Sequence, residues 1–259
     1  MTVEILQAEP ATDRARLALQ GLANGAKAAG LSVRFTRRYS ALGPWLLLWG
    51  PGAPDRAEAM RRHVRDGGRA LALDLAYWSR DRKVRVSVDA PHPQAVVMAR
   101  DLPETRLAAD RPPTADAWDP AGPVVVAEIG RKAQVQYGAQ VQDWEAHQVK
   151  LAAALGHEIV RRPKPRGPAE PIETALAGAS AVVTWHSNVA VDAIRLGIPA
   201  VCQDGAAAAV CPPSLGLAAV PEPLGAAARD RFLGNLAWFQ WDPAREGVAF
   251  WRFAQELLA

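Results

Sequence analysis

The chain has 259 residues, 49% of them hydrophobic, which is enough for one large or two small domains with buried cores. A formal net charge of +3 does not indicate a nucleic-acid-binding protein, although residues 1–118 hold 18 Lys/Arg against 13 Asp/Glu. Two cysteines, Cys202 and Cys211, are too few for a disulfide framework or a cysteine metal site, so we expect a reducing compartment.

The first residues, MTVEILQAEP, lack a basic region followed by an apolar core, so no signal peptide is expected. No apolar run approaches the roughly 20 residues that a membrane span needs. We therefore expect a cytoplasmic protein without a membrane span, and composition leaves the oligomeric state open.

Strand-like and helix-like segments alternate along the first half of the chain. Short apolar runs predict strands at 3–6, 31–35, 45–49 and 69–74. Helices are predicted from a Thr12 cap to near Gly30, and over 55–64. Such alternation is typical of a parallel sheet covered by helices.

A proline-rich stretch at 101–123 interrupts this alternation and predicts an interdomain linker. The alternation then restarts, with strands expected at 123–129, 158–160, 181–183 and 198–201 and helices at 142–155, 172–177, 226–239 and 244–258. We expect an α/β protein with two domains, 1–112 and 120–240, a cleft between them, and a C-terminal helix, 241–259, that packs back on the first domain.

Several common enzyme signatures are absent from the sequence. No GxGxxG follows the first strand, and there is no GxxxxGK[ST], GxSxG, HExxH or paired-cysteine spacing. These absences argue against the common dinucleotide, P-loop, serine-hydrolase and zinc classes.

The stretch TWHSNVAVDAIRLGIPAV, residues 184–201, places polar side chains directly after a buried strand. Ser187 or Asn188 can cap the helix that follows, and Gly197 suits the left-handed residue after it. Ligands bind at the carboxyl ends of strands in open α/β sheets, so this turn is a candidate binding site.

Cationic residues follow two other predicted strands of the second half. Arg131 comes after one strand, and Arg162 and Lys164 come after another in the segment RRPKP. Cations and small polar donors that converge at one sheet edge suit a phosphate group, and Asp192 could accept a hydrogen bond from a ribose hydroxyl. The alternatives are a solvated loop for RRPKP and a structural histidine for His186.

The segment VVTWHSNVAVDAIRLGIPAV resembles the nucleotide-binding segment of GT-B glycosyltransferases, particularly the capsule-polysaccharide and Kdo-transferase-like branch. EIVRRPKP is similar to an Arg-Pro-(His/Lys)-Pro stretch of those proteins. DLAYWSRDRKVRVSVDAPHP and LAWFQWDPAREGVAFWRF resemble segments of small phage-encoded glycosyltransferase-like proteins, which would place the protein in the host cytoplasm.

This resemblance implies two Rossmann-like domains that face each other across a cleft, and transfer of a sugar from a nucleotide-sugar donor. His186, Ser187 and Asn188 would contact the donor phosphates near Arg131, Arg162 and Lys164. Asp192 would hold the ribose, although the family often has Glu there. The family needs no bound metal, so the nucleotide sugar, expected to be UDP-linked, would be a co-substrate and no cofactor is expected.

Transfer with inversion also needs a base beside the acceptor hydroxyl. Asp74 has the best position, at the end of a predicted strand, and Asp89 and His92 are alternatives. Asp74 could instead cap a helix or pair with a nearby arginine such as Arg80 or Arg82. Tyr77 and Trp78 could stack on a sugar or a base, or lie in the core.

The basic segment around SRDRKVR predicts the acceptor side. Its cations could bind phosphates of duplex DNA that carries hydroxymethylated pyrimidines such as 5-hydroxymethylcytosine, and the residues concerned are Arg80, Arg82, Lys83 and Arg85. A surface glycan or small-molecule acceptor is also open. Two other functions fit the same fold: a nucleotide-sugar-binding module without transfer, and a sugar-nucleotide epimerase.

Overall fold

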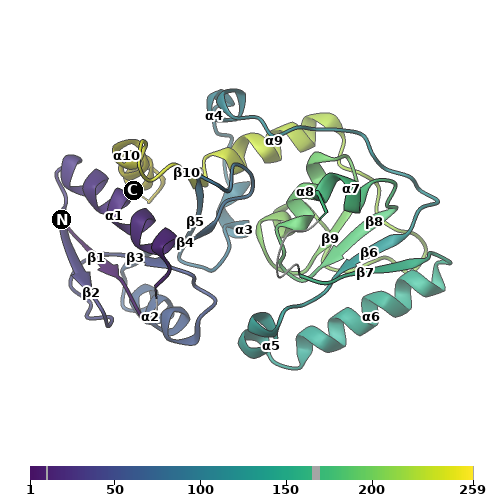
Figure 1. Cartoon of the computed structure of the whole chain (residues 1–259), viewed down its shortest axis with the longest axis horizontal. Helices are drawn as coiled ribbons and strands as arrows, with labels where there is room; N and C mark the ends of the chain where they lie inside the picture. The colour runs from purple at the N-terminus through teal and green to yellow at the C-terminus, as the bar shows by residue number, and fades with distance from the viewer. Residues whose placement is uncertain (10, 165–169, 259) are drawn as a thin grey trace. The chain divides into compact units, whose positions relative to one another are not determined.

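The computed structural model describes residues 1–9, 11–164 and 170–258, and the chain divides into two compact units (Figure 1). The first unit consists of Met1–Pro93 with Phe239–Ala259, and the second consists of Gln94–Trp238. Each unit is an α/β arrangement of the Rossmann-like kind with a sheet of its own, in agreement with the predicted fold class. No helix within the described ranges is long and apolar enough to cross a membrane.

The first unit contains a six-stranded sheet in the order β10-β5-β4-β3-β1-β2. The strands are β1 (Thr2–Leu6), β2 (Ser32–Thr36), β3 (Trp45–Trp49), β4 (Arg69–Leu75), β5 (Val84–Val88) and β10 (Gln240–Trp241). Strands β1 to β4 are parallel, as the sequence predicts, but β5 is antiparallel to β4, and β10 is antiparallel to β5. The expectation of an entirely parallel sheet is therefore wrong on this side of the sheet.

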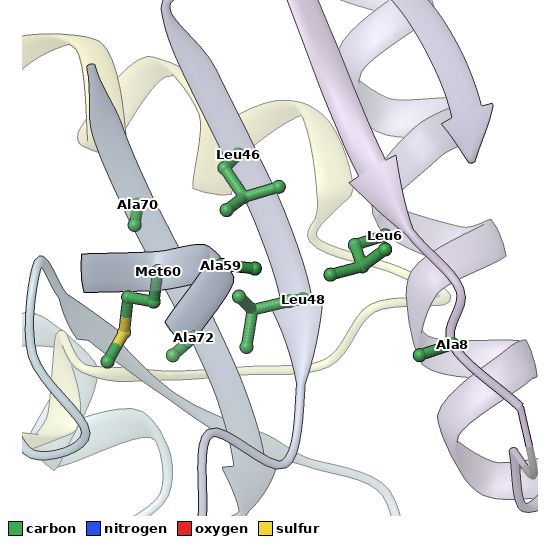
Figure 2. Packing of buried hydrophobic residues seen from close by; sticks show 8 residues of the cluster. All are labelled: Leu6, Ala8, Leu46, Leu48, Ala59, Met60, Ala70 and Ala72. Carbon is green, nitrogen blue, oxygen red and sulfur yellow. The ribbon is translucent and has the colours of Figure 1, made fainter. Parts of the chain in front are cut away.

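Three long helices cover this sheet: α1 (Asp13–Ala28), α2 (Pro54–Arg65) and α10 (Gly247–Leu258). Thr12 caps α1, since its hydroxyl accepts a hydrogen bond from the amide of Ala15 at 3.2 Å. Successive side chains of β3 point to opposite faces of the sheet. Leu46 and Leu48 pack in a cluster with Met60 of α2 (Figure 2), whereas the ring of Trp45 meets Trp251 of α10.

Helices α1 and α10 approach each other closely because glycines line their contact. A Cβ on Gly25 would lie 2.3 Å from the carbonyl carbon of Gly247, so no larger residue fits there without a shift. The indole of Trp251 donates to the carbonyl oxygen of Leu22 at 2.7 Å. The C-terminal helix is thus part of the first unit and packs on α1.

The second unit contains a four-stranded sheet in the order β7-β6-β8-β9, and every pairing in it is parallel. Its strands are β6 (Val124–Ala127), β7 (Ile159–Arg162), β8 (Ala181–Thr184) and β9 (Ala200–Cys202). Its helices are α3 (Gln94–Val97), α4 (Thr105–Ala109), α5 (Arg131–Tyr137), α6 (Gln140–Ala154), α7 (Ile172–Leu176), α8 (Val189–Arg195), α9 (Ala226–Ala237) and the 3₁₀ helix η1 (Ala206–Ala209). Val124 and Val183 pack with Ala152 of α6 in the core of this unit.

The proline-rich stretch at 101–123 is not a free linker but a part of the second unit. The amide of Ala117 donates to the carbonyl of Leu196 at 2.9 Å, and the Arg195 guanidinium donates to the carbonyl of Pro113 at 2.9 Å. The stretch lacks an apolar period because hydrogen bonds to its backbone, rather than a buried face, hold it against α8. The units accordingly divide at 93/94, ahead of the predicted boundary at 112.

Candidate functional site

The carboxyl ends of the four parallel strands in the second unit lie at one edge of its sheet. Six of the predicted donor-binding residues follow or end these strands: Arg131, Arg162, Lys164, His186, Ser187 and Asn188. Because β6 lies between β7 and β8, the segments that carry these residues are neighbours at that edge. Pro165, the last residue of RRPKP, lies outside the described residues.

The turn after β8 is fixed by hydrogen bonds of its own hydroxyl groups. The Thr184 hydroxyl accepts from the amide of Ser187 at 3.2 Å, and the Ser187 hydroxyl accepts from the amide of Val189 at 3.3 Å. Ser187 therefore bonds the first amide of α8 from the position before the N-cap residue Asn188, whose own side chain makes no capping bond. His186 and Asn188 are half-buried and Ser187 is exposed, so the turn presents polar groups to solvent from a rigid backbone.

A second loop of the same edge packs against this turn. The amide of Asp204, just beyond β9, donates to the carbonyl of Trp185 at 2.6 Å. Gly205 has φ +100, and a Cβ there would lie 3.0 Å from the carbonyl oxygen of His186. Glycine is needed at this position both for its backbone conformation and for the close approach of the two loops.

An aromatic and carboxylate cluster that sequence reasoning missed lies beside the turn. The Tyr137 hydroxyl donates to Asp204 at 2.7 Å, and the Gln94 amide donates to the other carboxylate oxygen at 2.7 Å. The Tyr137 ring lies 5.8 Å from the His186 ring and 5.5 Å from the Trp185 ring. These residues are far apart in the sequence, and only the strand order β6-β8-β9 indicates that they meet.

Asp192, the residue expected to hold a ribose, has a different environment. Its side chain is buried, and one carboxylate oxygen lies 3.1 Å from the guanidinium of Arg195 one turn further along α8. Arg195 also pairs with Glu173. The Asp192 carboxylate is thus buried and paired within α8, and its role as a ribose-binding residue stays a prediction.

Cations at the candidate edge differ in how they are held. Arg161 forms an ion pair with Glu145 at 2.9 Å, so its charge is partly balanced within the unit. Arg131 and Lys164 are exposed and Arg162 is half-buried, and no ion pair within the described ranges involves any of the three. They are the cations that remain available for an anionic group at this edge.

The predicted base, Asp74, lies near the carboxyl end of β4 in the first unit. One carboxylate oxygen lies 3.2 Å from the Arg85 guanidinium, opposite it on β5, and the other accepts from the amide of Leu75 at 2.8 Å. The Asp74 side chain is 38% exposed, whereas that of Arg85 is only 7% exposed. Asp74 thus pairs with a buried arginine rather than with Arg80 or Arg82.

Arg85 belongs to the interior of the first unit. Burial, the largest single effect, lowers the pKa of its guanidinium, but the charges and hydrogen bonds of Asp74 and Tyr77 together outweigh it and the pKa is raised. The guanidinium also lies 2.9 Å from Nδ1 of His92 and donates to the carbonyl of Pro91. Arg85 therefore organises a buried polar group and cannot bind a phosphate at the surface.

The predicted basic strip of four cations is wrong as a surface feature. Arg80 and Arg82 are exposed, but Lys83 and Arg85 are buried. Three other residues expected to contact the acceptor are also buried: Tyr77, Trp78 and His92. Arg85 is buried because it belongs to β5, an inner strand between β4 and β10, and Lys83 directly precedes that strand.

Asp89, an alternative base, and the thiols of the two cysteines are accounted for by their surroundings. Asp89 accepts from the amide of Ala70 at 2.8 Å and pairs with Arg69 at 3.1 Å. Burial raises the pKa of the Cys211 thiol to about 12 and that of Cys202 well above its ordinary value, so both thiols stay protonated near neutral pH. Within the part of the chain that the structure describes, no group of three His, Cys, Asp or Glu residues could hold a metal ion.

Two Rossmann-like units, each with a strand-end edge, define a glycosyltransferase-like fold of the GT-B kind. No family model matches the sequence, and no curated protein matches it. Among solved structures, the chain is similar to the β-Kdo 2,4 transferase of KpsC from Thermosulfurimonas dismutans, with a TM-score of 0.52 and 13% identity over 93% of this chain and 91% of that chain. It is also similar to the β-Kdo 2,7 transferase of the same KpsC, with a TM-score of 0.52 and 13% identity over 96% of this chain and 97% of that chain. At this identity, the likeness establishes the fold.

Proposed function

We propose that the chain transfers a sugar from a nucleotide-sugar donor to a hydroxyl acceptor. The observation that carries the proposal is the carboxyl edge of the second sheet, where available cations flank a rigid, polar turn. Lys164 and Arg131 would neutralise the phosphate charge, and Ser187 and His186 would bond to its oxygens. The likeness in fold to two sugar transferases supports the same activity.

In this reaction the acceptor oxygen attacks the anomeric carbon of the donor sugar. The bond between that carbon and the phosphate oxygen breaks, and its electron pair leaves with the nucleotide. Cationic side chains at the phosphates stabilise the negative charge that develops on the leaving group. In this proposal they take the role that a metal ion has in other transferases. The acceptor proton must pass to a base, for which Asp74 is the candidate from the sequence.

The donor is proposed to be UDP-linked, and the names of the two structural neighbours add Kdo as a candidate sugar. The Tyr137 ring beside His186 offers an apolar surface next to the phosphate turn, which suits a nucleobase or a sugar. A cytoplasmic site of action is consistent with two free thiols, Cys202 and Cys211.

Duplex DNA with hydroxymethylated pyrimidines is the weaker acceptor hypothesis. It depends on four phosphate-binding cations, and burial of Lys83 and Arg85 leaves only Arg80 and Arg82 of that set at the surface. A glycan or a small hydroxylated molecule needs fewer phosphate contacts and is therefore the acceptor class that we favour.

A nucleotide screen followed by a transfer assay tests the proposal. Uridine, cytidine and guanosine diphosphates and their sugar conjugates are added to the protein, and the rise in melting temperature identifies the base preference. Labelled donor is then incubated with glycan, small-molecule and hydroxymethylated-DNA acceptors. Nucleotide binding without any transfer would favour the binding-module alternative, interconversion of the donor sugar without an acceptor would favour the epimerase, and labelled DNA would restore the nucleic-acid hypothesis.

A further inference from the structure

A cavity of ≈ 380 Å³ opens in the first unit and is separate from every predicted donor-binding residue. It is lined by the first turns of α1, the turn before β5 and the loop before α10. Val84 on its wall pairs with Leu75, the last residue of β4, so the cavity lies at the carboxyl edge of the first sheet. Its volume is within the range of sites for small ligands.

The charged groups of this cavity differ in what they already bind. The buried carboxylate of Asp242 accepts from the amide of Ala244 at 3.0 Å and lies 3.9 Å from the Arg245 guanidinium. Arg14 donates one N–H to the carbonyl of Lys83 at 2.8 Å, and a guanidinium has five. Asp81 is exposed, and no hydrogen bond or ion pair with another described residue involves its carboxylate.

Arg82 also lines the cavity and is already engaged in an interaction of its own. Two other chemical functions remain open there: most of the N–H groups of Arg14 and the whole carboxylate of Asp81. Leu17 and Pro243 supply apolar wall between them, and the Leu17 side chain is exposed although it belongs to a helix that is otherwise well packed. A guanidinium binds carboxylates and phosphates through paired N–H donors, and a carboxylate accepts from a hydroxyl group. One small molecule that carries both an anionic group and hydroxyl groups would satisfy the two residues together.

We propose that this cavity binds the acceptor, and that the acceptor is a hydroxylated compound with a carboxylate or phosphate group. Arg14 binds the anionic group, and Asp81 accepts the proton of the hydroxyl that attacks the anomeric carbon. The new bond joins that oxygen to the anomeric carbon, the donor phosphate leaves with the electron pair, and Asp81 later releases the proton to water. This inference rests on the proposed function for its chemistry but not for its binding.

Asp81 suits the role of base better than Asp74 does. The Asp74 carboxylate is held on one side by Arg85 and on the other by the amide of Leu75, so a hydroxyl group would have to compete with both. Asp81 has no such competitor within the described ranges and faces a cavity large enough for a monosaccharide. Asp74 is then a positioning residue that anchors Arg85.

Binding is tested without any donor. D-glucuronate, D-glucose 6-phosphate and neutral D-glucose are titrated into the full chain and followed by saturation-transfer NMR. We expect at least one of the anions to bind about tenfold more tightly than glucose, which is about 1.4 kcal/mol, and Arg14→Ala to remove that preference, because hydrogen bonds to a charged group are stronger than neutral ones. Binding of glucuronate alone or of glucose 6-phosphate alone supports the proposal and identifies the anion.

The matched control is Arg16→Ala. Arg16 lies on the same turn of α1 but pairs with Asp13 and does not line the cavity, so this variant should keep the preference for the anion. Arg14→Lys, which keeps the charge, should retain part of it, so a folding defect in Arg14→Ala leaves the test intact. Equal binding of all three sugars, or an unchanged preference in both Arg14 variants, would overturn the proposal.

The catalytic part is tested by Asp81→Asn in the transfer assay. We expect the variant to bind the nucleotide and the anionic sugar as the wild type does and to lose turnover by about 10²-fold or more. Full turnover in this variant would overturn the role of Asp81. If the wild type binds no nucleotide at all, the proposed function fails, whereas the three sugar titrations still decide whether the cavity binds an anion.

Discussion

The two sheets differ in where their polar residues lie. In the second unit the polar residues come after the strands, and Ser187 and Lys164 stay exposed at the sheet edge. In the first unit the corresponding charged residues lie at or within an inner strand, and Lys83 and Arg85 are buried. A charge beyond the end of a parallel strand is thus a guide to a binding edge, whereas a charge inside an antiparallel strand serves the core.

The largest effect on stability that this comparison predicts is that of replacing Arg85. Replacement of Arg85 by Ala removes the guanidinium that pairs with Asp74 and contacts His92, and we expect it to lower the free energy of unfolding by about 3 kcal/mol, as for one side of a largely buried ion pair. Exposed Arg82, replaced by Ala, should change it by less than about 0.5 kcal/mol. Urea unfolding of the two variants measures the difference, and equal small effects would mean that Arg85 is not a core residue.

A second prediction concerns alkaline pH. Burial, with a smaller contribution from Asp74, raises the pKa of Tyr77 to about 12 from its ordinary value near 10, so the folded state holds the Tyr77 proton more tightly than the unfolded state. Stability should therefore fall as pH rises from about 10 to about 12, by roughly 2–3 kcal/mol from this group. Tyr77→Phe should flatten that part of the pH profile in unfolding experiments. An unchanged slope would contradict the burial of a neutral phenol.

For the second unit we predict a salt-dependent effect of Lys164. Lys164→Ala should weaken nucleotide diphosphate binding by about 2 kcal/mol at low ionic strength, and added salt should reduce the difference, because an exposed cation acts through a screened charge. Lys150→Ala, an exposed lysine on α6, should have little effect. Calorimetric titration at two salt concentrations measures both, and the same loss in the two variants would point to a general charge effect.

The smallest expected effect belongs to Ser187. Ser187→Ala should weaken nucleotide binding by about 1 kcal/mol, the scale of one hydrogen bond, and should also cost some stability because the hydroxyl caps the amide of Val189. Ser187→Thr keeps the hydroxyl and serves as the control. Binding that is unchanged in Ser187→Ala, together with a lower melting temperature, would assign the residue to the turn alone.

The sequence predicted the strands of the second sheet and the residues after them because each strand is a short apolar run with polar residues directly beyond it. It also predicted the first four strands of the first unit for the same reason, and the Thr12 cap because threonine is favoured at the start of a helix. Strand β5 escaped prediction because its residues, VRVSV, place an arginine among valines, and the partners of Arg85, such as Asp74 and His92, come from other segments.

Contacts between distant segments could not be predicted from local pattern. The bond between Tyr137 and Asp204 joins residues 67 positions apart, and the stretch at 101–123 is held by backbone bonds that leave no apolar period. The cavity around Arg14 and Asp81 combines three segments, of which the last comes from the C-terminal end of the chain. Such sites depend on strand order, which a single sequence does not specify.

A crystal structure of the chain with a bound nucleoside diphosphate tests the central claim most directly. We predict that the phosphates lie at the carboxyl edge of the four-stranded sheet, with oxygens within hydrogen-bond distance of the Ser187 hydroxyl and the Lys164 ammonium group. A nucleotide bound at the opposite edge of that sheet, or only in the first unit, would contradict the claim.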